Sequence, residues 1–269
     1  MRLINLIANK KYTNLLLMKN TLYIPIIIIL LFTTQSCKEK NGLTLKNLKG
    51  KVKSIDVYNY NAISKFGEIQ NGSLQYQETS YYNKNGDIEN VKNYKSDGSL
   101  QYQETTSYNK ESKIRDIKNY NSDGSLEFKI IYKYDDDGNV KEMQFYGSDG
   151  NLLGYNTIKT DKDGNIKEQK TYNIKGRFAG KNILIYNDFS KIIENKHYKH
   201  NGKLDVKTTY KYNDDGDVIL ENHYEYESKQ NNIWRFKCIK FDNKDNWIRQ
   251  VIYYNGIPKY AYTRDIEYY

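Results

Sequence analysis

The heptapeptide YNSDGSL, residues 120–126, decides the fold because close copies of it recur along the chain. The copies are YKSDGSL at 94–100, YDDDGNV at 134–140, YGSDGNL at 146–152, YKHNGKL at 198–204 and YNDDGDV at 212–218. An Asp-Gly or Asn-Gly pair between apolar positions is a strong signal for a tight β-hairpin. The heptapeptide therefore predicts the place where the chain turns, in preference to a ligand-binding loop.

The glycines of these units set the period of the sequence. Their positions are spaced alternately 14 and 12 residues apart, with Ser112 and Ser190 filling two of the glycine positions. The full repeat is 26 residues with two turns, and a period between about 20 and 50 residues indicates an array of stacked units. Because glycine accepts the positive φ of such turns, we predict structural turns at Gly86, Gly98, Gly124, Gly138, Gly150, Gly164, Gly176, Gly202 and Gly216.

The turn geometry also predicts a register and a face. A three-residue loop at 122–124 would make Asn121 face Ser125 and Tyr120 face Leu126. Side chains alternate between the faces of a strand, and the tyrosine and aliphatic positions are separated by even numbers of residues. We therefore expect all of them on one face, interrupted by polar residues such as Glu104. The predicted fold is all-β: an elongated antiparallel meander of stacked hairpins, forming an open or coiled sheet.

The repeat divides the chain into five segments. We expect a signal peptide at 1–36, a lipidated cysteine and linker at 37–47, a capping strand and irregular loop at 48–71, repeats at 72–217 and capping hairpins at 218–269. Both tryptophans, Trp234 and Trp247, lie in the last segment. Because large aromatic side chains dominate packing, we expect the best-packed part of the core there.

The segment MKNTLYIPIIIILLFTTQSC, residues 18–37, has the zones of a secretory signal: a basic start, an apolar run and a polar end. The apolar run of 11 residues is shorter than the roughly 20 needed to span a bilayer as a helix. The end TTQSC resembles the lipobox of bacterial lipoproteins, although Thr34 stands where its strict form has Leu. The resemblance implies lipidation of Cys37, and the length of the leader predicts that translation starts at Met18. The following KEKNG has no aspartate beside the cysteine of the kind that resembles an inner-membrane retention signal. This favours the outer membrane of a Gram-negative bacterium, on its periplasmic or outer side.

Composition narrows the class of partner. The formal charge is +9, but four of the basic residues lie in the predicted leader, and the remaining charges alternate in sign along the strands. This pattern indicates a solvated surface and argues against a nucleic-acid partner. Lipidation of Cys37 would leave Cys238 without a disulfide partner. Cys238 alternates with Trp234 and Phe236 and is expected to be a small core residue.

The stretches YDDDGNV, TDKDGNI and FDNKDNWI resemble the YD repeats of bacterial wall-associated and Rhs-type proteins, and the hairpin array also resembles MORN-type repeats. The resemblance covers residues 48–269. It implies a β-hairpin scaffold of the kind used in adhesion, carbohydrate contact, or toxin encapsulation and immunity.

No catalytic or metal-binding constellation stands out in the sequence. An EF-hand register on Gly138 would place Lys133 and Gln144 at the two end ligand positions, which excludes that calcium site. The histidines His197, His200 and His223 lack a further ligand at metal spacing. We therefore expect no enzyme, no metal and no cofactor, but an envelope-anchored scaffold that binds an envelope protein or polysaccharide. The alternatives are a glycan-binding surface protein and an immunity protein that neutralises a toxin.

Overall fold

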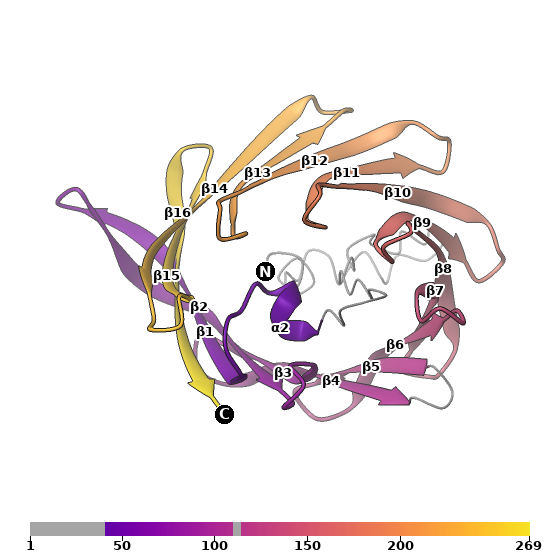
Figure 1. Ribbon diagram of the computed structural model, residues 1–269, viewed down its shortest axis with the longest axis horizontal. Helices are drawn as coiled ribbons and strands as arrows, with labels where there is room; N and C mark the ends of the chain where they lie inside the picture. The colour runs from indigo at the N-terminus through magenta and orange to yellow at the C-terminus, as the bar shows by residue number, and fades with distance from the viewer. Residues whose placement is uncertain (1–40, 110–113) are drawn as a thin grey trace.

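The computed structural model describes residues 41–109 and 114–269, which form a closed antiparallel barrel (Figure 1). Every strand pairs with its neighbours in the sequence, so the fold is a sixteen-strand all-β meander. A short helix, α2 (Gly42–Leu45), precedes the strands. The strands are β1 (Val52–Lys65), β2 (Glu68–Tyr82), β3 (Ile88–Lys95), β4 (Leu100–Asn109), β5 (Ile114–Asn121), β6 (Leu126–Tyr134), β7 (Val140–Gly147), β8 (Leu152–Thr160), β9 (Ile166–Asn173), β10 (Phe178–Tyr186), β11 (Ile192–Lys199), β12 (Leu204–Tyr212), β13 (Val218–Glu225), β14 (Gln230–Phe241), β15 (Trp247–Tyr254) and β16 (Ile257–Tyr268).

Closure of the barrel corrects the expected open or coiled sheet. The first strand pairs with the last from Val52–Tyr268 to Asn61–Tyr260. Every strand twists in the same sense, so a long meander turns back toward its own first strand. Pairing β1 with β16 then satisfies the backbone groups of both edges, which an open sheet would expose.

The hairpin turns have the predicted register. The Asn121 amide donates to the Ser125 carbonyl (2.9 Å) and the Gly124 amide donates to the Asn121 carbonyl (3.0 Å), while Tyr120 faces Leu126. All nine predicted turn glycines have positive φ, for example +82° at Gly124. Ser190 and Asp245 hold the same conformation, with φ of 55° and 60°. Ser112 lies outside the described residues.

The expectation that all tyrosine and aliphatic positions share one face is wrong. In the β2–β3 hairpin, Tyr82 faces Ile88 but Tyr81 faces Asn90, so one residue of β3 is skipped. Such a β-bulge shifts the alternation by one residue and moves the following side chains to the other face. Similar shifts occur in other hairpins of the repeat. Successive turns therefore place their tyrosine–aliphatic pairs alternately inside and outside the barrel.

The hydrophobic core lies on the inner face of the barrel. Many of its side chains lie near one end. There the pairs that flank alternate turns form an inner ring: Tyr82–Ile88, Tyr134–Val140, Tyr186–Ile192 and Tyr212–Val218. Hydroxyls of this ring join successive hairpins, because Tyr186 donates to the Ile166 carbonyl (2.8 Å) and Tyr212 to the Ile192 carbonyl (2.7 Å). The core extends around the whole barrel, so the expectation that it is best packed at the C-terminal end is not met.

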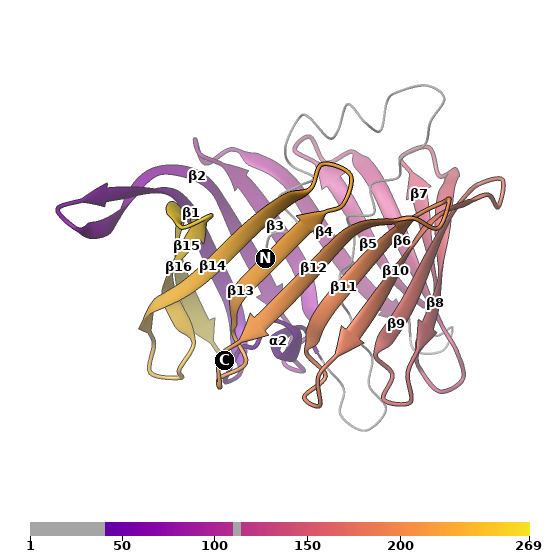
Figure 2. The same ribbon diagram turned by 90° about the horizontal axis from the view of Figure 1, so that it is seen from above.

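Residues 41–49, here called the strap, cross the same end of the barrel, where α2 lies inside the ring of strands (Figures 1 and 2). Asn41 donates to the Asn85 carbonyl (2.5 Å) in the β2–β3 turn. Asn47 donates to Asp217 Oδ1 (2.8 Å) beside the β12–β13 turn. The Lys49 amide donates to Asn246 Oδ1 (2.8 Å) in the β14–β15 turn. The strap thus joins three turns that are far apart in the sequence.

The segment from 61 to 71, expected to be an irregular loop, is instead the end of a regular hairpin. Strands β1 and β2 continue to pair as far as Lys65 and Glu68. This hairpin projects beyond the barrel in both views (Figures 1 and 2). Its turn exposes Phe66, which is 93% accessible to solvent. The long pairing of β1 with β2 stabilises it, and Arg249 of β15 donates to the Ile69 carbonyl of β2 (2.6 Å).

Candidate functional site

The outer face of the barrel carries a belt of half-buried aromatic and aliphatic side chains near the end opposite the strap. It consists of the pairs that flank the outward-facing turns: Tyr94–Leu100, Tyr120–Leu126, Tyr146–Leu152, Tyr172–Phe178 and Tyr198–Leu204. We call these ten residues the outer belt. Half-exposed tyrosines in a row offer apolar area together with hydroxyl groups, a combination that is enriched at binding surfaces.

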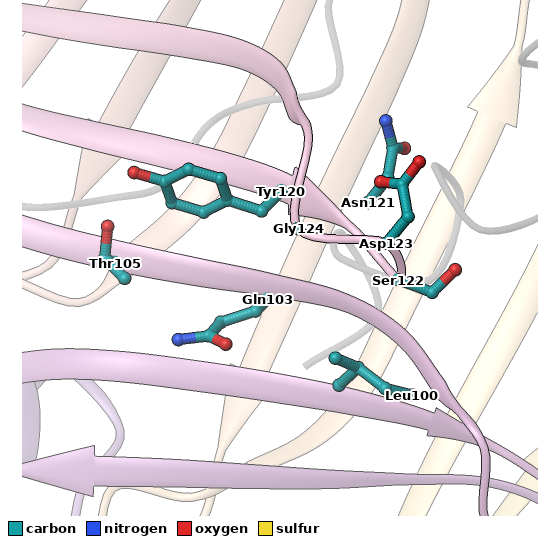
Figure 3. Close-up of a pocket in the computed structure, with 8 residues that line it drawn as sticks. All are labelled: Leu100, Gln103, Thr105, Tyr120, Asn121, Ser122, Asp123 and Gly124. Carbon is teal, nitrogen blue, oxygen red and sulfur yellow. The ribbon is translucent and has the colours of Figure 1, made fainter.

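One part of the outer belt is hollowed into a groove of about 540 Å³ (Figure 3). Leu100, Gln103 and Thr105 of β4 line one side, and Tyr120 of β5 lines the other, next to the turn 121–124. Figure 3 shows the Tyr120 side chain extending along the wall away from the turn, with its hydroxyl on the side of Thr105. The groove therefore combines an aromatic ring with an amide and a hydroxyl group.

The turn at the end of this groove is charged and internally hydrogen-bonded. Asp123 Oδ1 accepts from the Ser125 amide (2.9 Å) and from the Ser125 hydroxyl (2.6 Å). These bonds hold the pKa of the Asp123 carboxyl below its usual value, since they favour the ionised form. The groove thus ends at a permanent negative charge at neutral pH.

The inner wall next to the strap holds a second cluster of functional groups. Lys46 Nζ lies 3.5 Å from Glu78 Oε1 and donates to the Ser80 hydroxyl (3.1 Å). Glu78 is 4% exposed and Arg264 is 8% exposed, and the Arg264 guanidinium lies 3.2 Å from the centre of the Trp247 ring. Opposite charges offset the cost of burying these groups.

Glu104 lies on the same wall, and its carboxyl titrates near neutrality. Burial, reinforced by the charge of Glu78, raises the pKa of the Glu104 carboxyl to about 7. The nearby cations Arg115 and Lys46 counteract part of this rise. Glu104 faces Val91 and Asn119 in the register, so it belongs to the inner face that holds the core.

The far wall, from β8 to β13, is lined by amides and imidazoles. Asn182 Oδ1 lies 3.2 Å from His197 Nδ1, and Thr208 Oγ1 lies 3.2 Å from His223 Nδ1. Burial lowers the pKa of His197, which favours its neutral form at pH 7. Carboxylates approach both imidazoles, because Asp205 Oδ2 lies 4.0 Å from His197 Nε2 and Glu225 Oε1 lies 3.6 Å from His223 Nε2.

The structure separates the residues that the sequence singled out. Cys37 lies outside the described residues. The nine glycines lie at the two ends of the barrel, and they make no common site. His197 and His223 face the interior on β11 and β13, whereas His200 is exposed beside a turn. Within 41–109 and 114–269, no group of three His, Cys, Asp or Glu side chains is arranged to hold a metal ion.

Cys238 is the free cysteine of the described residues, and it is partly buried against the core. Gln250 donates to its sulfur (3.4 Å), and burial raises the pKa of the thiol. A thiol with a raised pKa is a poor nucleophile at neutral pH. Its position fits a packing role.

Sequence reasoning misses the groove and the charged inner wall. The heptapeptide predicts only that Tyr120 closes its hairpin, and nothing in it links Tyr120 to Gln103 on the preceding strand. For the inner wall, the available signal is the polar Glu104 on a face that the pattern predicts to be apolar. Lys46 falls in a predicted linker, because a short polar segment gives no sign of its contacts.

No protein-family model matches the chain, and no curated protein matches it. Among solved structures, a porin-like protein from Bacteroides uniformis is 11% identical over 81% of this chain and 98% of its own, with a TM-score of 0.52. The Tc holotoxin pore of Photorhabdus luminescens is 14% identical over 71% of this chain and 10% of its own, with a TM-score of 0.33. A DUF1329 family protein from Desulfovibrio piger is 6% identical over 81% and 86%, with a TM-score of 0.24. At such low identity, the first likeness shows a shared fold alone.

Across the described residues, no helix has the length and apolar character needed to cross a bilayer.

Proposed function

We propose that this protein is a lipid-anchored, non-catalytic binding scaffold of the bacterial envelope, and that its partner docks on the outer belt. The observation that carries the proposal is the belt itself: five tyrosines, each with an apolar partner, lie in a row on the outer wall near the end opposite the strap. Half-exposed tyrosines with apolar partners are typical of an interaction surface.

The rest of the outer wall supports a barrel that stands in water. Ion pairs lie along it, such as Lys207–Glu194 (2.5 Å) between β12 and β11, and Lys170–Glu168 (3.6 Å) within β9. A barrel that spans a membrane carries an outward apolar band about 25 Å tall. Charges in the middle of the wall are incompatible with such a band. The likeness of the fold to a porin-like protein therefore does not imply that this barrel spans a membrane.

The position of the strap supports attachment of the barrel to the membrane at the strap end. Asn41 is bound at the end of the barrel where both described termini of the sheet lie. Cys37 precedes it by four residues, so a lipid on its sulfur would be within about 14 Å of this end. The outer belt lies at the opposite end, directed away from the anchoring membrane. This arrangement suits a partner in the periplasm or outside the cell, with the anchor in the outer membrane of a Gram-negative bacterium.

The double-turn repeat of 26 residues supports the finer proposal that the chain is a YD- or MORN-like repeat protein. The repeat would then serve to build the belt, since each copy contributes one outward tyrosine with its apolar partner. A glycan-binding surface protein is the second candidate, favoured by the groove at Tyr120, where an aromatic ring lies beside neutral polar groups.

In-cell photo-crosslinking tests the proposal. p-Benzoylphenylalanine in place of Tyr146 puts the probe in the belt, and the same amino acid in place of Lys159 puts it on the outer face outside the belt. We expect an envelope partner, identified by mass spectrometry, from the first position and not from the second. Equal capture at both positions, or none at either, would contradict a partner on the belt. Cys37→Ser should release the protein from the membrane fraction, which tests the anchor separately.

A further inference from the structure

Each copy of the repeat places one tyrosine of the outer belt opposite a residue of the preceding strand, and the type of that facing residue varies from copy to copy. Each belt tyrosine faces a residue on the preceding strand: Gln77 faces Tyr94, Gln103 faces Tyr120, Lys129 faces Tyr146, Tyr155 faces Tyr172 and Lys181 faces Tyr198. This facing position decides whether the ring of the belt tyrosine is covered.

Three of the rings are covered by the facing residue. Lys129 Nζ lies 5.0 Å from the centre of the Tyr146 ring, and Lys181 Nζ lies 5.2 Å from that of Tyr198. The Tyr155 ring is stacked on Tyr172 with 5.1 Å between their centres. A cation or a second ring on the aromatic face occupies the area that a ligand would use.

The two remaining tyrosines face glutamines. At Tyr94 the amide of Gln77 donates to Asp56 Oδ1 (3.3 Å) on β1, so this glutamine is already engaged by a carboxylate. At Tyr120 the facing residue is Gln103, and the two residues line the groove (Figure 3). The amide of Gln103 is uncharged and shorter than a lysine side chain, so it leaves space beside the Tyr120 ring.

We propose that the Tyr120 groove binds one ring of a neutral carbohydrate, an inference that rests on the proposed function and names the ligand of one part of the belt. A sugar ring has an apolar C–H face that packs on an aromatic ring and hydroxyls at its edge that bond to amides and hydroxyls. The Gln103 amide supplies a donor and an acceptor, and Thr105 supplies a hydroxyl. Leu100 adds apolar contact on the opposite side of the groove.

The charge of the groove selects against other ligands that stack on tyrosine. The ionised Asp123 carboxylate stands at its end, and it repels phosphate and acidic sugars. A nucleic acid would require lysine or arginine at its phosphates. Among the residues that line the groove there is no cation, so a neutral sugar fits best.

The test uses the detergent-solubilised full chain and three hexasaccharides, of glucose, mannose and N-acetylglucosamine, with saturation-transfer NMR and titration calorimetry. We expect at least one to bind, and Tyr120→Ala to weaken it roughly tenfold. Gln103→Lys recreates the covered arrangement of Tyr146 and should weaken binding as strongly. Thermal unfolding of Gln103→Lys should match the parent, because its side chain lies on the outer face and Tyr120 keeps its pairing with Leu126, so loss of binding in this variant is not loss of fold.

The repeat also supplies a variant that should gain a site. Lys129→Gln uncovers Tyr146, and we expect it to add a second binding event of similar affinity. Failure of all three hexasaccharides to bind, or unchanged binding by Gln103→Lys, would overturn the sugar assignment. Crosslinking of a protein partner at Tyr146 without any sugar binding would leave the scaffold function standing, so the two failures are distinguishable.

Discussion

Ile88 and Tyr94 lie six residues apart on strand β3, and their side chains occupy opposite faces of the barrel wall. Ile88 is 7% exposed in the inner core, whereas Tyr94 pairs with Leu100 in the outer belt. The cause is the bulge between Ile88 and Asn90, which shifts the side-chain alternation by one residue. One row of tyrosines thus closes the core and the other lies on the outer face, so alternate turns supply the core and the outer surface.

Barrel closure can be tested with a disulfide between the first and last strands. Tyr58 and Thr263 are partners in the pairing of β1 with β16, so the double variant Tyr58→Cys and Thr263→Cys should crosslink on mild oxidation. Cross-strand partners lie within the Cα separation that a disulfide requires. Faster migration on a non-reducing gel would report the bond. The control Tyr58→Cys with Lys129→Cys, on a distant strand, should not crosslink; if the first pair also fails, the barrel is not closed at this seam.

The ion pair between the strap and the inner wall should stabilise the fold. Lys46→Met leaves the Glu78 carboxylate, 4% exposed, without its lysine. We expect the free energy of unfolding to fall by about 1–3 kcal/mol, the usual cost of an unsatisfied buried group. The matched control is Lys53→Met, because the Lys53–Glu267 pair is closer (2.8 Å) but exposed. Exposed pairs contribute roughly 0–1 kcal/mol. Urea denaturation that gave the same loss for both variants would show that the strap does not depend on Glu78.

Glu104 should make the protein less stable as the pH rises from its unfolded pKa to its folded pKa. Its folded pKa of about 7 lies above the ordinary value of 4.5, so between these values the folded state binds more protons than the unfolded state. Stability therefore falls as the pH rises through this window and the carboxylate becomes charged. Glu104→Gln removes this charge, and we expect a higher Tm than the parent at pH 8 and a flatter dependence of Tm on pH. A parallel shift of the whole profile would contradict the role assigned to Glu104.

Removing glycine from one turn should destabilise the protein, and introducing glycine into another should stabilise it. Gly124 has φ of +82° and open space where a Cβ atom would lie, so Gly124→Val is penalised by backbone conformation alone. We expect a loss of about 1–2 kcal/mol. Asp245 already holds φ of 60°, and Asp245→Gly should gain up to about 1 kcal/mol. Thermal unfolding of the two variants checks both signs. An unchanged Tm for Gly124→Val would mean that the turn tolerates a side chain with positive φ.

The sequence by itself determined the local structure of this protein. Turn chemistry acts over a few residues, so the heptapeptide was enough to predict the loop at 122–124, the pairing of Tyr120 with Leu126 and the all-β class. The groove was only partly accessible: Tyr120 could be placed in a hairpin, but its neighbour Gln103 lies 17 residues away on another strand.

The tertiary structure decided the features that depend on the whole sheet. Bulges such as the one beside Ile88 place the two tyrosine rows on opposite faces of the barrel. The spacing of apolar residues in the sequence does not reveal such a one-residue shift in register. The pairing of β1 with β16 closed the barrel, because the twist of sixteen strands adds up only over the complete meander. Closure also gave the strap its three turns to bind, and it set the outer belt at the opposite end of the barrel.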